Sequence, residues 1–299
     1  MTGAIGEEVL ASLMGTELIR TGRFFRVRMR FSREVITIVI IVVVLAVGIS
    51  VGLYHLLKRT PHLAEPVAAH CSVRALGFDL ALDPEQAQIA ATIAAVAARR
   101  KLPERAVVIA YATAIQESKL YNLDYGDRDS VGVFQQRESQ GWGTKKQIMD
   151  PVYATNRFFA ALVKVKNYRK IPLAEAAQAV QRSAGGYAYA PHEEQAKALA
   201  AAFTGRVPES VHCWYPSGGR TPAPAPRTEE ARKQLARALG STTITSRRRG
   251  WLVAAWSVAH AEKYGLSRVR YAGASWSNDL EAKGWRTGDG SGTGKVELS

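Results

Sequence analysis

The segment PERAVVIAYATAIQES, residues 103–118, decides the fold of this chain. It is apolar on all sides between Ala106 and Ile115, a pattern that predicts a helix buried on several faces. Pro103 suits a helix start, and one carboxylate, Glu117, stands at the far end. A helix C-terminus carries partial negative charge and apolar neighbours reduce solvation, so both features favour a protonated carboxyl group. Glu117 is therefore either a general acid or an ordinary solvated helix end.

Further helices around this segment predict a mainly α domain. Residues 83–102 open with a capping box, in which Asp83 precedes Pro84 and Gln86, and then place apolar residues at helical spacing. Between 121 and 144, glycines replace the helical period, which predicts a loop with a short β-hairpin. Three more helices are expected, opened by Pro151, Pro172 and Pro191.

The stretch 35–57 contains no formally charged residue. As a helix it would reach roughly 34 Å, enough to cross a bilayer core of about 30 Å. A buried core helix and a cleaved signal peptide are the alternatives, and the length favours a retained transmembrane signal anchor. Six Arg precede the span within residues 1–34, whereas only Lys58 and Arg59 follow it closely. The positive-inside rule then predicts a single-pass cell-membrane protein with a basic cytoplasmic tail, 1–34, and everything after the span outside.

The net charge of +14 is expected to lie mostly on the exported part, because residues 1–34 carry four Glu against their six Arg. Such a charge attracts polyanions. Outside a membrane it favours anionic wall polymers, and no nucleic acid is expected as a partner. The chain's two cysteines, Cys71 and Cys213, bracket the helical domain in a compartment where disulfides persist. We predict that they form a disulfide, with two buried free thiols as the alternative.

After residue 215 the sequence predicts a second, smaller domain. Residues 216–227 have the composition of a Pro/Ala linker, 228–286 predict a small α/β domain with a strand in SRVRYAG, and 287–299 are expected to be disordered. The tryptophans of this region either form its core, which is favoured, or stack on sugars. They are Trp251, Trp256, Trp276 and Trp285.

Several motifs follow the central helix in a defined order. The pair Glu117–Ser118 precedes YGDRDSVGVFQQRESQGWGT (125–144) and AAQAVQRSAGGYAYA (176–190). This pattern resembles the lysozyme-like fold of the soluble lytic transglycosylases, and more closely the membrane-anchored transglycosylase-like proteins of actinobacteria. The resemblance covers roughly residues 80–205. It implies a lysozyme-like helical domain with a short β-hairpin, which we place at 71–215, between the transmembrane helix and the C-terminal α/β domain.

The resemblance also implies a function and a set of site residues. Glu117 matches the catalytic acid of an enzyme that cleaves peptidoglycan glycan strands between N-acetylmuramic acid and N-acetylglucosamine. In such transglycosylases the muramic C6 hydroxyl attacks in place of water and gives a 1,6-anhydro product. VFQQ and RSAGGYAY depart from the usual Leu-Met-Gln and Tyr-Asn-Ala-Gly motifs, which puts substrate contacts more in doubt than the acid. The residues expected to bind substrate are Ser118, Ser130, Gln135, Gln136, Gln178, Gln181 and Tyr187.

Alternatives remain at the level of sequence. Asp124, Asp127 and Asp129 could supply a second carboxylate for true hydrolysis, although a solvated turn with Arg128 in local pairs is favoured. The six His residues and two Cys residues make no recognisable metal-ligand set, so neither metal nor cofactor is expected. The rival to an enzyme is an inactive wall-binding or assembly module of an envelope-spanning secretion or conjugation apparatus.

Overall fold

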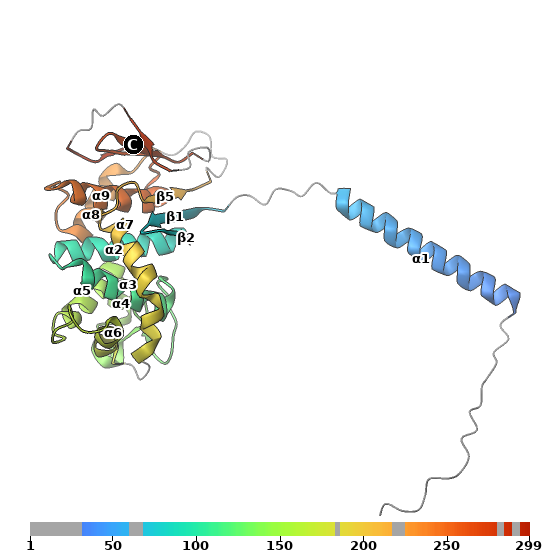
Figure 1. The fold of residues 1–299 in the computed structure, drawn as a ribbon, viewed down its shortest axis with the longest axis horizontal. Coiled ribbons are helices and arrows are strands. Elements are labelled where there is room, and N and C mark those ends of the chain that lie inside the picture. The colour runs from blue at the N-terminus through green and yellow to red at the C-terminus, as the bar shows by residue number, and fades with distance from the viewer. Residues whose placement is uncertain (1–31, 60–67, 183–185, 217–224, 280–283, 289–293) are drawn as a thin grey trace, which may run out of the picture. The chain divides into compact units, whose positions relative to one another are not determined.

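A computed structural model describes residues 32–59, 68–182, 186–216, 225–279, 284–288 and 294–299 (Figure 1). The chain divides into two compact units, Met1–Glu65 and Pro66–Ser299. The predicted tail 1–34 lies almost entirely outside the described residues, as does most of the predicted linker 216–227.

The first unit contains helix α1, Arg33–Arg59. Its segment Arg33–His55 is long and apolar enough to cross a membrane, with a mean hydropathy of 3.1 and none of its surface buried. The prediction of a helix that could span a bilayer at 35–57 is confirmed to that extent. The side chains from Val35 to Tyr54 are exposed, as expected of a helix whose apolar surface is covered by lipid rather than by protein.

The second unit is built around α3, Glu104–Ser118. Ile109 and Tyr111 are fully buried, and the Tyr111 hydroxyl donates to the Ala90 carbonyl at 2.8 Å. This bond joins α3 to α2, Pro84–Arg99. The remaining helices of this part are α4 Lys145–Ile148, α5 Pro151–Leu162, α6 Leu173–Gln181 and α7 Glu193–Phe203.

The predicted local signals form as expected. Asp83 precedes α2 and its backbone N–H donates to Gln86 Oε1 at 2.8 Å. Asp150 caps α5 through its carboxylate. The third predicted helix starts later than its proline, because Pro191 lies in a 3₁₀ segment, Gly186–His192, that leads into α7. The predicted hairpin is β3 Ser130–Val131 paired with β4 Gln136–Arg137, followed by the 3₁₀ turn Glu138–Gln140.

A three-stranded antiparallel sheet was missed by the sequence reasoning. Strand β1, His70–Ala75, lies between β2, Phe78–Leu82, and β5, Val211–Trp214. A two-residue turn joins β1 to β2, and both its residues have positive φ, 52° at Leu76 and 82° at Gly77, which is the backbone of a tight hairpin turn.

The sheet carries the disulfide. Cys71 and Cys213 stand directly opposite each other on β1 and β5, and their sulfurs are bonded. The predicted bridge is therefore confirmed. It joins residues 142 positions apart, and both cysteines are buried.

The region after residue 225 differs from the predicted separate domain. Helices α8, Thr228–Leu239, and α9, Arg247–Ala259, lie against α2 (Figure 1). One buried apolar cluster runs through both regions, and residues 66–299 form a single compact unit. α8 buries one apolar face and α9 is buried from Gly250 to Ala259, so packing on α2 removes this apolar surface from water.

A second sheet follows the short helix α10, Ala261–Tyr264. Its order is β8-β7-β6-β9, with β6 Arg268–Tyr271, β7 Ala274–Ser277, β8 Arg286–Thr287 and β9 Glu297–Leu298. The strand predicted in SRVRYAG is thus present as β6. The predicted disorder of 287–299 is wrong for its described end, since β9 pairs with β6 and the Ser267 and Arg268 backbone amides donate to the Ser299 carbonyl oxygen.

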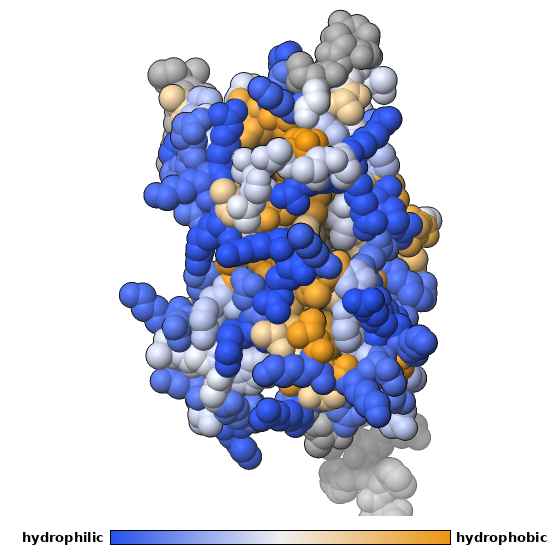
Figure 2. Space-filling view, turned by 90° about the vertical axis from the view of Figure 1, so that its left-hand side faces the viewer, coloured by the Kyte–Doolittle hydropathy of each residue, from blue (hydrophilic) through white to orange (hydrophobic). Residues whose placement is uncertain are grey.

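The tryptophans of this region lie mainly in the core, as favoured. Trp251, Trp256 and Trp276 are at most 3% exposed. The Trp276 indole donates to the Cys213 carbonyl at 3.1 Å, and half-buried Trp285 donates to the Val211 carbonyl at 2.9 Å. Both bonds attach the second sheet to strand β5 of the first. One face of the molecule is hydrophilic over most of its surface, with hydrophobic side chains visible between the polar ones (Figure 2).

Candidate functional site

The C-terminal end of α3 presents Glu117 half-buried beside the 3₁₀ segment. The hydroxyl of Tyr189 donates to Glu117 Oε1 at 2.7 Å. Tyr189 is 2% exposed, so its hydroxyl has little alternative in water. α3 ends here because Lys119 adopts the left-handed conformation, with φ of 55°. The carboxyl group is thereby fixed at one oxygen, and no hydrogen bond to its other oxygen comes from the residues that the structure describes.

Gln116, the residue before Glu117, also joins α3 to the 3₁₀ segment. The His192 ring nitrogen Nε2 lies 2.9 Å from Gln116 Oε1, which requires the proton on Nε2 because the amide oxygen only accepts. Burial lowers the pKa of His192, and the charge of Lys119 lowers it further. A neutral His192 is therefore compatible with this contact at neutral pH.

The β3–β4 hairpin is held against the end of α3 by two predicted site residues. The hydroxyl of buried Ser118 donates to the Val133 carbonyl at 2.8 Å. The side-chain amide of Gln181, at the end of α6, donates to the Phe134 carbonyl at 2.7 Å. Both side chains therefore position the hairpin turn beside Glu117, a role different from the predicted substrate contact.

The hairpin's own polar residues also bind backbone. The Gln135 amide donates to the Tyr125 carbonyl at 3.2 Å, and Gln136, 1% exposed, donates to the Ala154 carbonyl at 3.3 Å. Ser130 is buried in β3. Of these three, half-buried Gln135 is the one with surface available to a ligand.

The structure separates the two tyrosines of GGYAYA. Tyr187, which the sequence selected, is 92% exposed, whereas Tyr189 contacts Glu117. The motif GGYAYA contains both tyrosines, so it could also have indicated Tyr189. Because the two residues are only two positions apart on a 3₁₀ segment, the sequence does not tell which ring is buried. Gln178 is half-buried on α6. Residues 183–185, which precede the segment, lie outside the described residues.

Two acids of DYGDRDS, Asp127 and Asp129, are engaged in the loop that carries them. Asp129 accepts from Arg137 Nε at 2.6 Å and from the Ser139 backbone N–H at 2.8 Å. These bonds, the Ser139 backbone bond first, hold the pKa of Asp129 well below its usual range. Asp127 pairs with Arg128 at 3.9 Å. The favoured turn with local pairs is present, although Asp129 pairs with Arg137 and not with Arg128.

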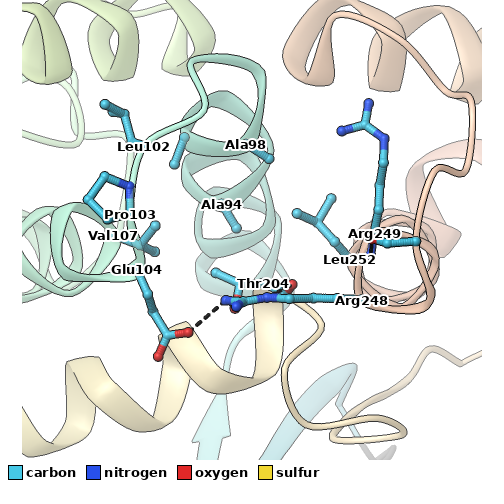
Figure 3. A pocket seen from close by; sticks show the side chains of 12 residues that line it. Ala94, Ala98, Leu102, Pro103, Glu104, Val107, Thr204, Arg248, Arg249 and Leu252 are labelled. Atoms are coloured by element: carbon cyan, nitrogen blue, oxygen red, sulfur yellow. Dashed lines mark hydrogen bonds and ion pairs between the residues drawn. The ribbon is translucent and has the colours of Figure 1, made fainter.

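Within the described residues, no cluster of three or more His, Cys, Asp or Glu side chains could hold a metal ion. A pocket of about 260 Å³ lies at the other end of α3, near Glu104 (Figure 3). There the Arg248 guanidinium donates to Glu104 Oε2 at 2.6 Å and to Thr204 Oγ1 at 2.7 Å. The pocket is therefore separate from the Glu117 site, since the two acids stand at opposite ends of one helix.

Compared with known proteins, the chain matches no protein-family model and no curated protein sequence.

Proposed function

We propose that this protein is a membrane-anchored enzyme that cleaves the glycan strands of peptidoglycan outside the cell membrane, with Glu117 as its general acid. The observation that carries the proposal is the 2.7 Å hydrogen bond from Tyr189 to one oxygen of a half-buried carboxyl group at the end of the central helix. The motif resemblance around Glu117 and the hairpin supports the substrate class. The apolar helix α1 supports the anchor.

The geometry fits proton donation. Tyr189 occupies Oε1, so Oε2 is the oxygen available to protonate the leaving glycosidic oxygen. The carboxylate left after transfer accepts the same tyrosine bond, and a bond to the charged form is stronger than one to the neutral form. The interaction therefore strengthens as the proton leaves.

One carboxyl group is enough for a lytic transglycosylase, because the muramic C6 hydroxyl serves as the nucleophile. Its oxygen bonds to the anomeric carbon as the glycosidic bond breaks, and the leaving sugar oxygen takes the proton of Glu117. The C6 hydroxyl gives its own proton to the resulting Glu117 carboxylate, so the acid is restored and a 1,6-anhydro end is released. Asp129 is engaged with Arg137 and Ser139 and Asp127 pairs with Arg128, which favours this outcome over hydrolysis and leaves Asp124 as the remaining candidate for a second carboxylate. Hydrolysis would need a second carboxylate free to activate water.

The test is mass spectrometry of soluble products after the full chain, in detergent micelles, is incubated with insoluble peptidoglycan. Glu117→Gln keeps an acceptor for Tyr189 and removes the acid. Glu175→Gln, at an exposed site on α6, is the matched control. We expect anhydro-muropeptides from wild type and control and none from Glu117→Gln.

Other outcomes reassign the protein. Reducing ends in place of anhydro ends would make it a muramidase. Products from the Glu117→Gln variant at the wild-type rate would remove Glu117 as the acid. Pelleting of all variants with the wall without any product would favour the second candidate, a noncatalytic wall-binding or assembly module of an envelope-spanning machine. The backbone engagement of Gln135 and Gln136 is the observation that keeps this candidate in view.

A further inference from the structure

A pocket of about 330 Å³ lies between α5, α6 and the turn that follows the hairpin. Its lining includes the small apolar side chains of Ala161, Ala179 and Val180 together with Trp142. Trp142 is half-buried, and its indole N–H donates no hydrogen bond to any residue that the structure describes. A half-buried indole ring beside small apolar side chains provides a flat apolar surface with one donor available to a ligand.

The rim of this pocket is cationic. Arg157, Lys164 and Arg182 line it, and no acidic residue does so among the described residues. Arg157 is held by the carbonyl oxygens of Gly141 and Trp142. Lys164 and Arg182 are exposed, and neither forms an ion pair or side-chain hydrogen bond within the described part of the chain. Two charges are thus free to meet an anion.

The contrast with the pocket in Figure 3 is direct. There Glu104 accepts from both Arg248 and Arg206, so each of these two cations already pairs with a carboxylate. No carboxylate lines the pocket near Trp142 among the residues that the structure describes. Lys164 and Arg182 follow the C-terminal ends of α5 and α6, whose partial negative charge offsets some of their repulsion but provides no counter-ion.

Positive charge continues beyond the pocket along the loop between α5 and α6. Lys166, Arg169 and Lys170 are exposed, and residues 157–174 contain no acid. A ligand with one carboxylate would use a single cation. A chain with charges at regular intervals would engage the pocket and the loop together.

We propose that this cationic pocket, defined by Trp142, Arg157, Lys164 and Arg182, binds a phosphodiester-linked polyol or sugar polymer. Lys164 and Arg182 pair with its phosphates, and Trp142 packs on the intervening carbons or sugar ring. An acidic peptide fits less well, because the lining offers neither a strand edge nor a set of backbone groups to bind its amides. The proposal rests on the proposed function in one respect, that this part of the chain lies outside the cell membrane. It does not require Glu117 to act as a catalyst.

Two hydrogen bonds connect the end of α6, which lines the pocket, to the end of α3 that carries Glu117. The side-chain amide of Gln181, whose neighbours Val180 and Arg182 line the pocket, donates to the Phe134 carbonyl. The carbonyl of the adjacent Val133 accepts from Ser118, which follows Glu117 in the chain. A polymer held there would retain the protein beside its substrate in the wall.

The test measures binding of fluorescently labelled poly(glycerol phosphate) to the full chain in zwitterionic nanodiscs by anisotropy. Lys164→Gln with Arg182→Gln removes the two free cations. Lys233→Gln with Arg270→Gln removes two exposed cations elsewhere and is the matched control. We expect the first pair to weaken binding about 10-fold or more, the control to change it less than about 2-fold, and added salt to weaken wild-type binding. Trp142→Phe should also weaken it by losing the indole donor.

Equal loss of polymer binding in both double variants would overturn the proposal, because binding would then depend on the total positive charge of the protein and not on this pocket. Stronger competition by poly-glutamate would indicate an acidic peptide, and tighter binding of a single-stranded oligonucleotide would indicate nucleic acid; either result overturns it. Cleavage of polymer-free peptidoglycan is measured on the same samples. Wild type that cleaves peptidoglycan but does not bind the polymer would contradict the pocket alone, whereas wild type that binds the polymer but does not cleave would contradict the proposed enzyme alone.

Discussion

The Tyr189 hydroxyl lies 2.7 Å from Glu117 Oε1, although the two residues are 72 positions apart in the chain. The bond joins a 3₁₀ segment to the end of the central helix. The bond engages one of the two carboxyl oxygens of Glu117 and so orients the carboxyl group. Tyr189 is therefore a positioning residue for the proposed acid.

Replacing Tyr189 tests this relationship. In Tyr189→Phe the ring still fills its buried site, but Glu117 loses its donor, so we expect cleavage of peptidoglycan to fall roughly 10-fold or more, since a bond to a charged group contributes about 1.5–3 kcal/mol. The pH profile of the remaining activity should shift as well. Tyr187→Phe is the matched control, because Tyr187 is 92% exposed. Equal effects of the two substitutions would contradict the assignment.

Ser118 is expected to matter for stability rather than for ligand contact. Ser118→Ala leaves the Val133 carbonyl without its 2.8 Å donor in a buried site. The predicted cost is about 1–3 kcal/mol in the free energy of unfolding, measured by urea denaturation, with faster amide exchange in the hairpin. Thr242→Ala, at an exposed position, should change stability by less than about 0.5 kcal/mol. Unchanged stability with lost substrate binding would instead support the contact predicted from sequence.

The Cys71–Cys213 bridge closes a loop of 142 positions. Changing both cysteines to alanine should lower the free energy of unfolding by about 2–5 kcal/mol, because the unfolded chain regains conformational freedom. Wild type treated with a reductant should move toward the variant, and the variant itself should not respond. An identical unfolding midpoint for oxidised wild type and variant would show that the sheet needs no crosslink.

Stability should fall as the pH is lowered from 7 to 5. Burial lowers the pKa of His260 to about 3, and burial also lowers the pKa of His192 and His212. In the unfolded chain the pKa of a histidine is about 6.5. Below that pH the unfolded chain binds more protons than the folded one, so the stability present at higher pH is lost on acidification. For His260 alone the loss at pH 5 is about 2 kcal/mol.

His260→Asn checks the main contribution, because asparagine does not titrate. Its free energy of unfolding, measured by urea denaturation at each pH, should change less between pH 7 and pH 5 than that of wild type. Any loss of the stacking of His260 on Trp256, whose ring centroids are 3.9 Å apart, affects the variant at every pH. The slope is therefore the informative quantity, and equal slopes would refute the role of His260.

Much of the helical architecture could be predicted from local sequence. Asp83 with Gln86 and Asp150 with Pro151 mark helix starts through groups that act within a few residues. The apolar run of α1 needs no partner to be recognised, because its length and composition alone match a bilayer. The disulfide followed from having two cysteines in an expected oxidising compartment.

The first sheet escaped prediction because its pairing is non-local. β1 and β5 lie at opposite ends of the helical region, and short strands carry little periodic signal. The Leu76–Gly77 turn offered a hint through its glycine, but Leu at a positive φ is uncommon and gives no turn signature. The packing of α8 and α9 on α2 was likewise hidden, since apolar faces indicate burial without naming a partner.

The sequence by itself determined most of the helices, the apolar segment of α1 and the candidate acid, because each depends on short-range spacing or on composition. Only the tertiary structure decided that Tyr189 and not Tyr187 faces Glu117, that Ser118 and Gln181 hold the hairpin, and that Lys164 and Arg182 share one pocket. Those outcomes depend on which surfaces meet across long stretches of chain. The packing of these surfaces depends on burying apolar groups and pairing polar groups throughout the unit, so it cannot be predicted from any local sequence pattern.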